Sequence, residues 1–435
     1  FGSRASCLPR VPPPPAGGPS RAMVLQWQSV LAMCSGERTK ILEDAWSTPI
    51  DCGGAGPFAV GSGALAVWPD PCEVRVPRDA AELRPVSEAD LEASMDEASN
   101  RVRPWDGGSF RLVKRLQEAP GNRGVVDMMT SRLHRGSSVA VKRMPTKWVT
   151  FGPGDFLSWH PKSPERPWQD LGIMLELNAR GFPYACEFLG LYCDQDTTYV
   201  VTSLAEDGDL FSWSLRGPRP GPTREALMQP IVLQIFTAVR WLHELGIAHR
   251  DLSLENVLLT HGSGGHMRAK LIDFGMATCA RWCRAEVRGK ETYQAPEMHC
   301  EAAYDAWLAD AFQLGAMLFP MAAQDYPWAS TKPGACSLFS SMQRRGFRNF
   351  LATKELRRSD GRRLAEILSP GLAGLLEGLL ELRPEHRLCL GEGQLALEGR
   401  RSVWDEAWMA GAAEASDCAR PWPCPAFEGE ALAPL

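Results

Sequence analysis

The sequence is poor in the features that mark membrane and secreted proteins. No apolar run approaches the roughly 18 residues that a membrane-spanning helix requires, and no basic region leads into a small-residue cleavage site. We therefore expect neither a membrane span nor a signal peptide. The 13 cysteines include no CxxC pair, which argues against a zinc site and a dense disulfide framework. Free thiols suit a reducing compartment, so we expect a cytoplasmic protein.

Charge of either sign is not in excess. Among the 435 residues, 47 Lys and Arg stand against 52 Asp and Glu, which gives a formal net charge of −5. Such a balance supplies no field that would concentrate nucleic acid or anionic lipid on the chain. Nucleic acid is therefore not an expected partner.

Residues 1–105 have few long apolar patterns and are rich in proline and glycine, as in VPPPPAGGP at 11–19. Such a composition buries too little apolar surface to offset the entropy of ordering. We therefore expect a low-complexity, mostly disordered N-terminal extension. Residues 87–102 are an exception and predict a helix, because Ser87 and Asp90 resemble a capping box and Leu91 recurs with later apolar residues at helical spacing. This helix could pack against the next domain.

From residue 106 to about 400 the pattern changes, with strands first and helices afterwards. Residues 110–116, 138–143 and 197–203 are alternating or rich in β-branched residues and predict strands. Apolar residues three or four apart then predict helices at 227–242, 307–322 and 370–382. We expect an α+β domain over 106–400, with a small β-rich lobe and a larger helical lobe, and a C-terminal tail at 401–435.

Two motifs carry the chemistry. HRDLSLEN (249–256) follows the first long helix, and IDFG (272–275) follows a short apolar stretch. Asp251 can accept a hydroxyl proton, whereas Asn256 and Asp273 are oxygen donors suited to Mg²⁺ ions that bridge nucleotide phosphates. The set predicts phosphoryl transfer from a nucleotide with Mg²⁺.

These motifs resemble the eukaryotic protein kinase family, in its serine/threonine type, and the resemblance implies a two-lobed kinase fold. It implies that Lys142 of VAVK contacts the α and β phosphates. APGNRGVV (119–126) matches the family's glycine loop if Ala119 replaces its first glycine, and Gly121 and Gly124 would then approach phosphate. An ordinary hairpin turn is the open alternative for this segment.

The resemblance also implies an adenine site and an apolar stack that links the lobes. The adenine site would consist of the gatekeeper and hinge, Thr202, Ser203, Leu204 and Ala205, with Val126, Ala140 and Leu258 around the ring. The stack would consist of Met174, Phe188, His249 and Phe274. Apolar stripes are also common in plain cores.

Further matches extend the resemblance through the helical lobe, so that it covers residues 110–397. Glu297 of APE would pair with Arg387. Asp310 in YDAWLADAFQLG would brace the catalytic loop, although Phe312 replaces the family's Trp.

The acid that should pair with the strand lysine departs from the family pattern. In RPWQDLGIMLEL (166–177) the apolar residues align so that Asp170 takes the place of the family's Glu. We expect Asp170 to pair with Lys142 through a side chain one methylene shorter. Glu176 falls on another face of the helix, where we expect a solvated carboxylate.

The insertion at 146–167, rich in Trp, Pro and Gly, would cap the lobe or dock a partner.

A second departure concerns the catalytic loop. Ser253 stands where serine/threonine kinases usually carry a lysine, and Lys290 stands where the family has a threonine. The resemblance brings both positions to one site, so Lys290 would return the lost charge as a catalytic residue. The alternative is a solvent-facing Lys290 with the charge simply lost.

The activation segment, residues 276–297, has no well-placed phosphorylation site. Kinases with an HRD arginine, here Arg250, usually pair it with a phosphate, but the usual position holds Glu286. This fixed carboxylate would pair with Arg250 in place of a phosphate. An exposed loop carboxylate is the alternative. Cys279 and Cys283 in this segment lack metal spacing and His partners.

Three functions compete: an active protein kinase, a catalytically weak or dead kinase-like scaffold that binds ATP or partners, and a kinase-fold enzyme acting on a small molecule. Retention of the catalytic acids and the strand lysine favours the first. We expect transfer of the γ-phosphate of ATP to Ser/Thr hydroxyls of protein substrates by a monomer. Asp209 and Glu255 match acids that select basic residues, so we expect a modest preference for basic substrates.

Overall fold

The computed structural model describes residues 84–119, 124–145, 152–160, 163, 166–261, 267–300, 302–356 and 361–410. Gly121, residues 1–83 of the expected extension, residues 411–435 of the expected tail and much of the insertion at 146–167 lie outside the described residues. Nothing in the structure bears on the predictions made for residues 1–83, Gly121 and residues 411–435, whereas the described part of the insertion includes Phe156, which is buried in the core.

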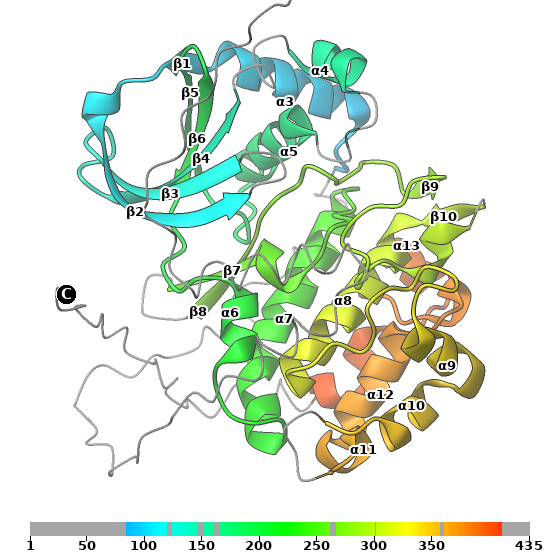
Figure 1. Ribbon diagram of the computed structural model, residues 1–435. Helices are drawn as coiled ribbons and strands as arrows, with labels where there is room; N and C mark the ends of the chain where they lie inside the picture. The colour runs from blue at the N-terminus through cyan, green and yellow to red at the C-terminus, as the bar shows by residue number, and fades with distance from the viewer. Residues whose placement is uncertain are drawn as a thin grey trace, which may run out of the picture. The chain divides into compact units, whose positions relative to one another are not determined.

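A six-stranded sheet in the order β1-β5-β6-β4-β3-β2 forms the first part of the fold (Figure 1). The neighbours pair antiparallel except β1, which runs parallel to β5. The strands are β1 Val102–Pro104, β2 Phe110–Ala119, β3 Gly124–Ser131, β4 Ser138–Pro145, β5 Phe188–Cys193 and β6 Thr197–Ser203. The three predicted strands correspond to β2, β4 and β6, whereas β1, β3 and β5 were not predicted.

Three helices accompany the sheet: α3 Glu88–Asn100, α4 Pro153–Trp159 and α5 Pro167–Ala179. α5 packs on the sheet through buried residues such as Leu171, and α3 packs on α5 (Figure 1). The predicted capping box is confirmed, because Ser87 Oγ accepts from the Asp90 N–H at 3.2 Å and the Ser87 N–H donates to the Asp90 carboxylate at 2.9 Å. The folded part therefore begins before residue 106, since α3 and β1 are built into it.

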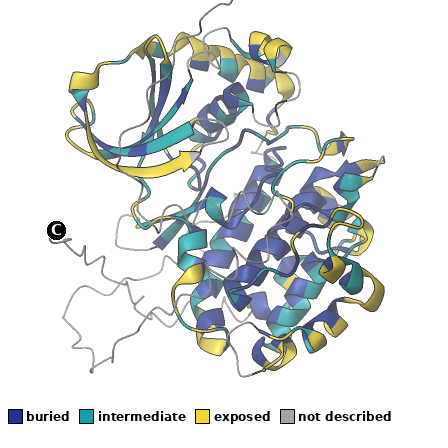
Figure 2. Cartoon of the chain, in the orientation of Figure 1, coloured by how far each residue is buried: buried dark blue, intermediate teal, exposed yellow. Residues whose placement is uncertain are grey.

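The second part of the fold is helical. Its helices are α6 Leu210–Leu215, α7 Pro222–Glu244, α8 Ala306–Ala323, α9 Ser337–Arg345, α10 Phe347–Thr353, α11 Leu364–Ile367, α12 Pro370–Leu379 and α13 Gly393–Leu397. The three predicted helices correspond to α7, α8 and α12. These three contribute to the core of this part, and in Figure 2 α8 is buried throughout whereas α7 is buried on one side.

Among the described residues, α8 is the one helix that is long and apolar enough to cross a membrane. All of its residues are buried inside the protein, as is usual for the central helix of a helical core. Its apolar character is accounted for by packing, for example of Gly315 directly against Leu379 of α12.

Short elements complete the helical part and carry its functional loops. The strands β7 Val257–His261 and β8 Met267–Leu271 form one hairpin, and β9 Trp282–Arg284 pairs with β10 Ala303–Asp305. Single 3₁₀ turns lie at Leu254–Asn256, Pro296–His299, Pro384–His386 and Val403–Asp405. Trp408 is buried and donates to Glu225 of α7 at 3.2 Å, so the fold continues beyond residue 400. The predicted two-lobed α+β fold is confirmed.

Candidate active site

The loop that carries Asp251 is held by two buried side chains of α8. Asp310 accepts the backbone N–H groups of His249 and Arg250, each at 2.7 Å. Gln313 accepts from Leu252 N–H at 2.8 Å and donates to the Arg250 carbonyl at 2.9 Å. These contacts support Arg250 in a left-handed backbone conformation, φ 62°. The predicted bracing by Asp310 is confirmed, whereas Gln313 was not predicted.

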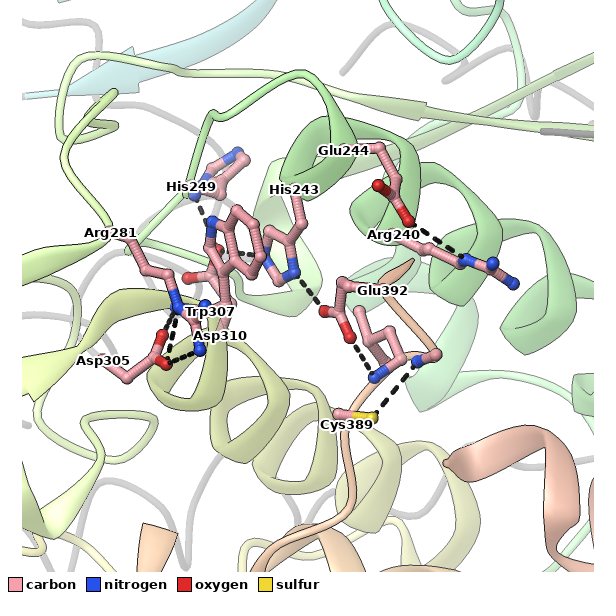
Figure 3. A network of polar contacts seen from close by, with 12 residues as sticks. Arg240, His243, Glu244, His249, Arg281, Asp305, Trp307, Asp310, Cys389 and Glu392 are labelled. Carbon is pink, nitrogen blue, oxygen red and sulfur yellow. Dashed lines mark hydrogen bonds and ion pairs between the residues drawn. The ribbon is translucent and has the colours of Figure 1, made fainter. Parts of the chain in front are cut away.

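His243 of α7 extends this support into the core (Figure 3). Its Nε2 lies 3.0 Å from Asp310 Oδ2 and its Nδ1 lies 2.6 Å from Glu392 Oε1. Burial opposes protonation, but the hydrogen bonds and charges of the two carboxylates prevail and raise the pKa of His243 to about 9. The catalytic loop therefore rests on a buried imidazolium held between two acids.

Asp251 and Asn256 are brought together by the loop. Asn256 Nδ2 donates to the Asp251 carbonyl at 2.7 Å and to Asp251 Oδ2 at 3.0 Å. Asp251 Oδ1 is buried and has no hydrogen-bond partner among the described residues. Burial raises the pKa of Asp251 to about 7, although the nearby Lys290 ammonium acts in the opposite direction. The result is an oriented carboxylate with one oxygen that has no hydrogen-bond partner among the described residues, and a pKa suited to general base catalysis.

Asp170 connects the sheet lysine to the segment that carries Asp273. Its Oδ2 lies 3.0 Å from Lys142 Nζ, and its Oδ1 accepts the backbone N–H of Phe274 at 2.9 Å. Lys142 Nζ is also 4.0 Å from Asp273 Oδ1, and this charge lowers the pKa of Asp273. The predicted Asp170–Lys142 pair is present and direct. The shorter acid therefore spans the gap without a bridging water.

Glu176 differs from the expectation of a solvated carboxylate. It does lie on another face of α5, but that face is covered by α3. Ser94 Oγ of α3 donates to Glu176 at 2.6 Å, and Arg180 Nε lies 3.0 Å from the same carboxylate. The reason for the error is that a helix from outside the family pattern covers this face, and the sequence did not show which face it would cover.

Asn256 and Asp273 have the oxygens that a magnesium ion prefers. Asn256 uses its amide nitrogen on Asp251, which leaves the amide oxygen as the atom for a cation, and the Asp273 side chain is 37% exposed. The described residues contain no group of three or more His, Cys, Asp or Glu that could hold a metal by itself. These two side chains offer oxygen atoms of the kind that a Mg²⁺ ion would need. Cys279 and Cys283 are free thiols.

Four of the residues expected around the nucleotide share one face of the sheet. Val126 lies opposite Lys142, and Ala140 lies opposite Thr202. Directly opposed residues share a face, as do residues two apart on a strand, so these four side chains line the face that carries the Lys142–Asp170 pair. Ser203 ends β6, Ala205 follows it and Leu258 lies on β7. Backbone pairing of Ala119 with Gly124 closes the β2–β3 hairpin.

The residues of the expected apolar stack fall into two groups. Met174 belongs to the core between α5 and the sheet, and Phe188 packs against this core. His249 and Phe274 face one another with ring centroids 5.2 Å apart. Burial lowers the pKa of His249, so this imidazole is neutral and serves as part of the packing.

The activation segment contacts the rest of the helical part at its middle and at its C-terminal end. Arg250 Nη1 donates to Glu286 Oε2 at 2.6 Å, which is the pairing expected for a fixed carboxylate. Arg387 Nη2 donates to Glu297 at 3.0 Å, as predicted for the APE glutamate. Between these points, Lys290 Nζ donates to Ser253 Oγ at 2.9 Å, so the two departures from the family pattern are in direct contact.

A sheet-bearing lobe and a helical lobe that bring a strand lysine, a loop aspartate and a DFG aspartate together define the protein kinase class. A family model described as "Protein kinase domain" matches residues 120–395, and the chain belongs to this family. The geometry described above agrees with that assignment.

Curated relatives include serine/threonine-protein kinase ULK3 of Xenopus laevis, which is 31% identical over 47% of this chain and 40% of that protein. Testis-specific serine/threonine-protein kinase 3 of Mus musculus is 34% identical over 31% of this chain and 48% of the relative. Probable serine/threonine-protein kinase zyg-1 of Caenorhabditis elegans is 28% identical over 53% of this chain and 30% of the relative. The match thus spans less than half the length of each of these relatives.

Proposed function

We propose that this chain is an ATP-dependent protein kinase that transfers the γ-phosphate of ATP to serine or threonine hydroxyls of protein substrates. The observation that carries the proposal is the position of Asp170, which contacts Lys142 at 3.0 Å and the Phe274 N–H at 2.9 Å. One carboxylate thereby aligns the strand lysine with the DFG segment, which is the arrangement that phosphoryl transfer in kinases requires. The similarity to serine/threonine kinases supports the acceptor class.

In this proposal each side chain has a defined task. Asp251, oriented by Asn256, would accept the hydroxyl proton of the substrate on the oxygen that Asn256 does not bond. Lys142, held by Asp170, binds nucleotide phosphate oxygens. Asn256 and Asp273 would hold Mg²⁺, which would offset the negative charge of the phosphates. Gly124, Val126, Ala140, Thr202, Ser203, Ala205 and Leu258 would surround the nucleotide.

The two acids that were expected to select basic residues near the acceptor already contact other groups of the protein. Glu255 Oε2 lies 2.9 Å from Lys290 Nζ, and Asp209 caps α6 by accepting the Ser212 N–H at 2.6 Å. Less negative charge is therefore available to a basic peptide than the sequence indicated. We expect only a weak preference for basic residues, and a peptide library would measure it.

A cytoplasmic location stays a proposal from the cysteine pattern, to be checked by microscopy of the tagged chain.

The direct test is incubation of the purified chain with Mg·ATP and generic peptide substrates, followed by mass spectrometry. Wild type should phosphorylate Ser or Thr, and Asp251→Asn should lose about 10²–10⁴-fold of the transfer rate while Mg·ATP still raises its melting temperature. Glu385→Gln, at an exposed carboxylate of the helical part, is the matched control and should behave as wild type. A wild type that binds nucleotide but transfers no phosphate with Mg²⁺ or Mn²⁺ would favour the scaffold instead.

A further inference from the structure

Lys290 belongs to the activation segment but its ammonium lies on the catalytic loop. Nζ donates to Ser253 Oγ at 2.9 Å and lies 2.9 Å from Glu255 Oε2. Ser253 is fully buried and follows Asp251 by two positions, so both contacts fix the ammonium beside the catalytic carboxylate.

The backbone before Lys290 explains why the side chain reaches this place. Gly289 has φ +79°, and a Cβ on it would lie 2.8 Å from the Arg250 carbonyl and 3.2 Å from Asp251 Oδ1. The segment therefore runs directly against the loop at a position that only glycine tolerates. Gln294 Nε2 anchors it there by donating to the Gly289 carbonyl at 2.7 Å.

The electrostatic surroundings keep this lysine charged. Burial alone would lower the pKa of Lys290, but Glu255, Asp251 and Asp273 together outweigh burial and raise it. A permanent positive charge thus stands next to the point where an acceptor hydroxyl would meet a phosphoryl group, and it belongs to a side chain that is only about a third exposed (34%).

We propose that Lys290 is a catalytic residue whose ammonium binds an oxygen of the phosphoryl group during its transfer, with Ser253 and Glu255 holding it in place. The inference deepens the proposed kinase function and rests on it. In the step itself, the bond from the γ-phosphorus to the β–γ bridging oxygen breaks and its electrons leave with ADP. A new bond forms between the acceptor oxygen and phosphorus, and the acceptor proton passes to Asp251. Lys290 exchanges no proton and stabilises the negative charge on the phosphoryl oxygens.

The test exploits the contact between positions 253 and 290. Lys290→Thr removes the charge and should lower kcat by about 10²–10³-fold, as loss of a group aimed at transition-state charge does, with a much smaller change in KM for ATP. Ser253→Lys alone places a second ammonium beside the first in a buried position and should also be harmful. The double variant Ser253→Lys/Lys290→Thr returns one charge to the site and should recover at least tenfold over Lys290→Thr.

Two controls separate catalysis from support of the fold. Lys290→Arg keeps the charge and should retain more activity than Lys290→Thr. Glu255→Gln breaks the ion pair but keeps the ammonium, so it should lower the melting temperature as much as Lys290→Thr while it costs less in kcat.

Failure of this inference and failure of the proposed function have different signatures. An active wild type in which Lys290→Thr leaves kcat within about threefold, or in which the two substitutions act additively in the double-mutant cycle, would overturn the role of Lys290 alone. Equal losses of kcat in Glu255→Gln and Lys290→Thr would assign Lys290 a purely structural role. A wild type without phosphotransfer would overturn the proposed function, and this inference with it.

Discussion

Glu286 of the activation segment accepts a hydrogen bond of 2.6 Å from Arg250, a residue 36 positions earlier in the chain. The Arg250 side chain is only 5% exposed and also donates to the Met276 carbonyl at 2.8 Å. Tyr304 fixes the backbone of Glu286 by donating to its carbonyl at 2.7 Å. A carboxylate encoded in the sequence thus connects the segment to the catalytic loop at the point where other kinases use a phosphate.

The first prediction is activity without phosphorylation. Two hydroxyls of the activation segment, those of Thr292 and Tyr293, are poor sites for a kinase, because both residues are buried and hydrogen-bond to Ala329 and Tyr326. Protein made in bacteria and treated with phosphatase should therefore stay active. Glu286→Ala should lower kcat by about fivefold to tenfold, consistent with a charge-assisted hydrogen bond of which one partner is partly exposed.

Arg250→Ala should lower activity about as far as Glu286→Ala, and the double variant should be little worse than either, since both remove the same contact. Glu385→Ala is the control at an exposed carboxylate. Activity that depends fully on a phosphate at Thr278 or Thr292, detected by mass spectrometry of active and inactive fractions, would contradict this mechanism.

The second prediction concerns Asp170. Asp170→Ala removes the contacts to both Lys142 and the Phe274 N–H, and we expect a loss of kcat/KM of about 30-fold or more, as for a hydrogen-bonded charge pair. Asp170→Glu keeps the charge with one more methylene and should stay within about threefold of wild type or exceed it. Glu176→Gln is the comparison on the same helix and should affect stability more than kcat. A larger kinetic loss from Glu176→Gln would mean that the pairing acid is misassigned.

The third prediction concerns pH and His243. Its pKa is about 9 in the folded protein and about 6.5 when unfolded, so protonation favours the folded state. The stabilisation is complete below pH 6.5 and disappears as the pH rises to about 9, with a total of roughly 3 kcal/mol. Urea unfolding from pH 6 to 9 should show this decline in wild type, and it should be much flatter in His243→Gln. His386→Gln, at an exposed histidine, should keep the wild-type slope, whereas parallel curves for wild type and His243→Gln would refute the prediction.

The fourth prediction tests the contact between α3 and α5. A Cβ on Gly172 would lie 2.7 Å from Met95 Cγ and 2.9 Å from Leu91 Cδ1, so Gly172→Ala should force α3 outward. We expect a loss of about 1 kcal/mol in stability and a lower kcat, because Asp170 is on the same helix. Gly154→Ala in α4 meets nothing within 4 Å and is the matched control. Equal stability and activity in the two variants would show that the close packing of α3 on Gly172 affects neither the stability of the protein nor its kcat.

The helices and strands whose apolar residues recur at a regular spacing were predicted from the sequence. Strands in which a charged residue or a register shift interrupts that spacing were not. β3 was not predicted because Asp127, a buried carboxylate, breaks its apolar pattern. In the structure Asp127 lies 3.0 Å from Arg115 Nε and 2.9 Å from Arg143 Nη2, on the strands either side. No local pattern shows that distant arginines will neutralise a buried acid. β5 has a register shift between Phe188 and Gly190, which removes simple alternation.

The site was predictable wherever a residue takes a position of the family pattern. Alignment with the family pattern identified Asp170, Lys290 and Glu286 together with their partners, although all three differ from the residue type usual at those positions. The family pattern did not predict the role of Gln313, whose two hydrogen bonds to the catalytic loop depend on the register of α8. The family pattern also did not predict the contact between Glu176 and α3, because α3 precedes the region that the pattern covers.

The packing of residues 84–104 has a consequence for anyone who shortens this chain. The Val86 N–H donates to the Leu245 carbonyl at 2.8 Å, α3 covers α5, and β1 lies along β5 at the border of the sheet. A fragment begun at residue 106, or at residue 120 where the family model begins to match, would leave β5 as an edge strand that pairs only with β6. Its free N–H and C=O groups would then be open to strands of other molecules. Such a fragment would keep every residue assigned to catalysis and still tend to self-associate.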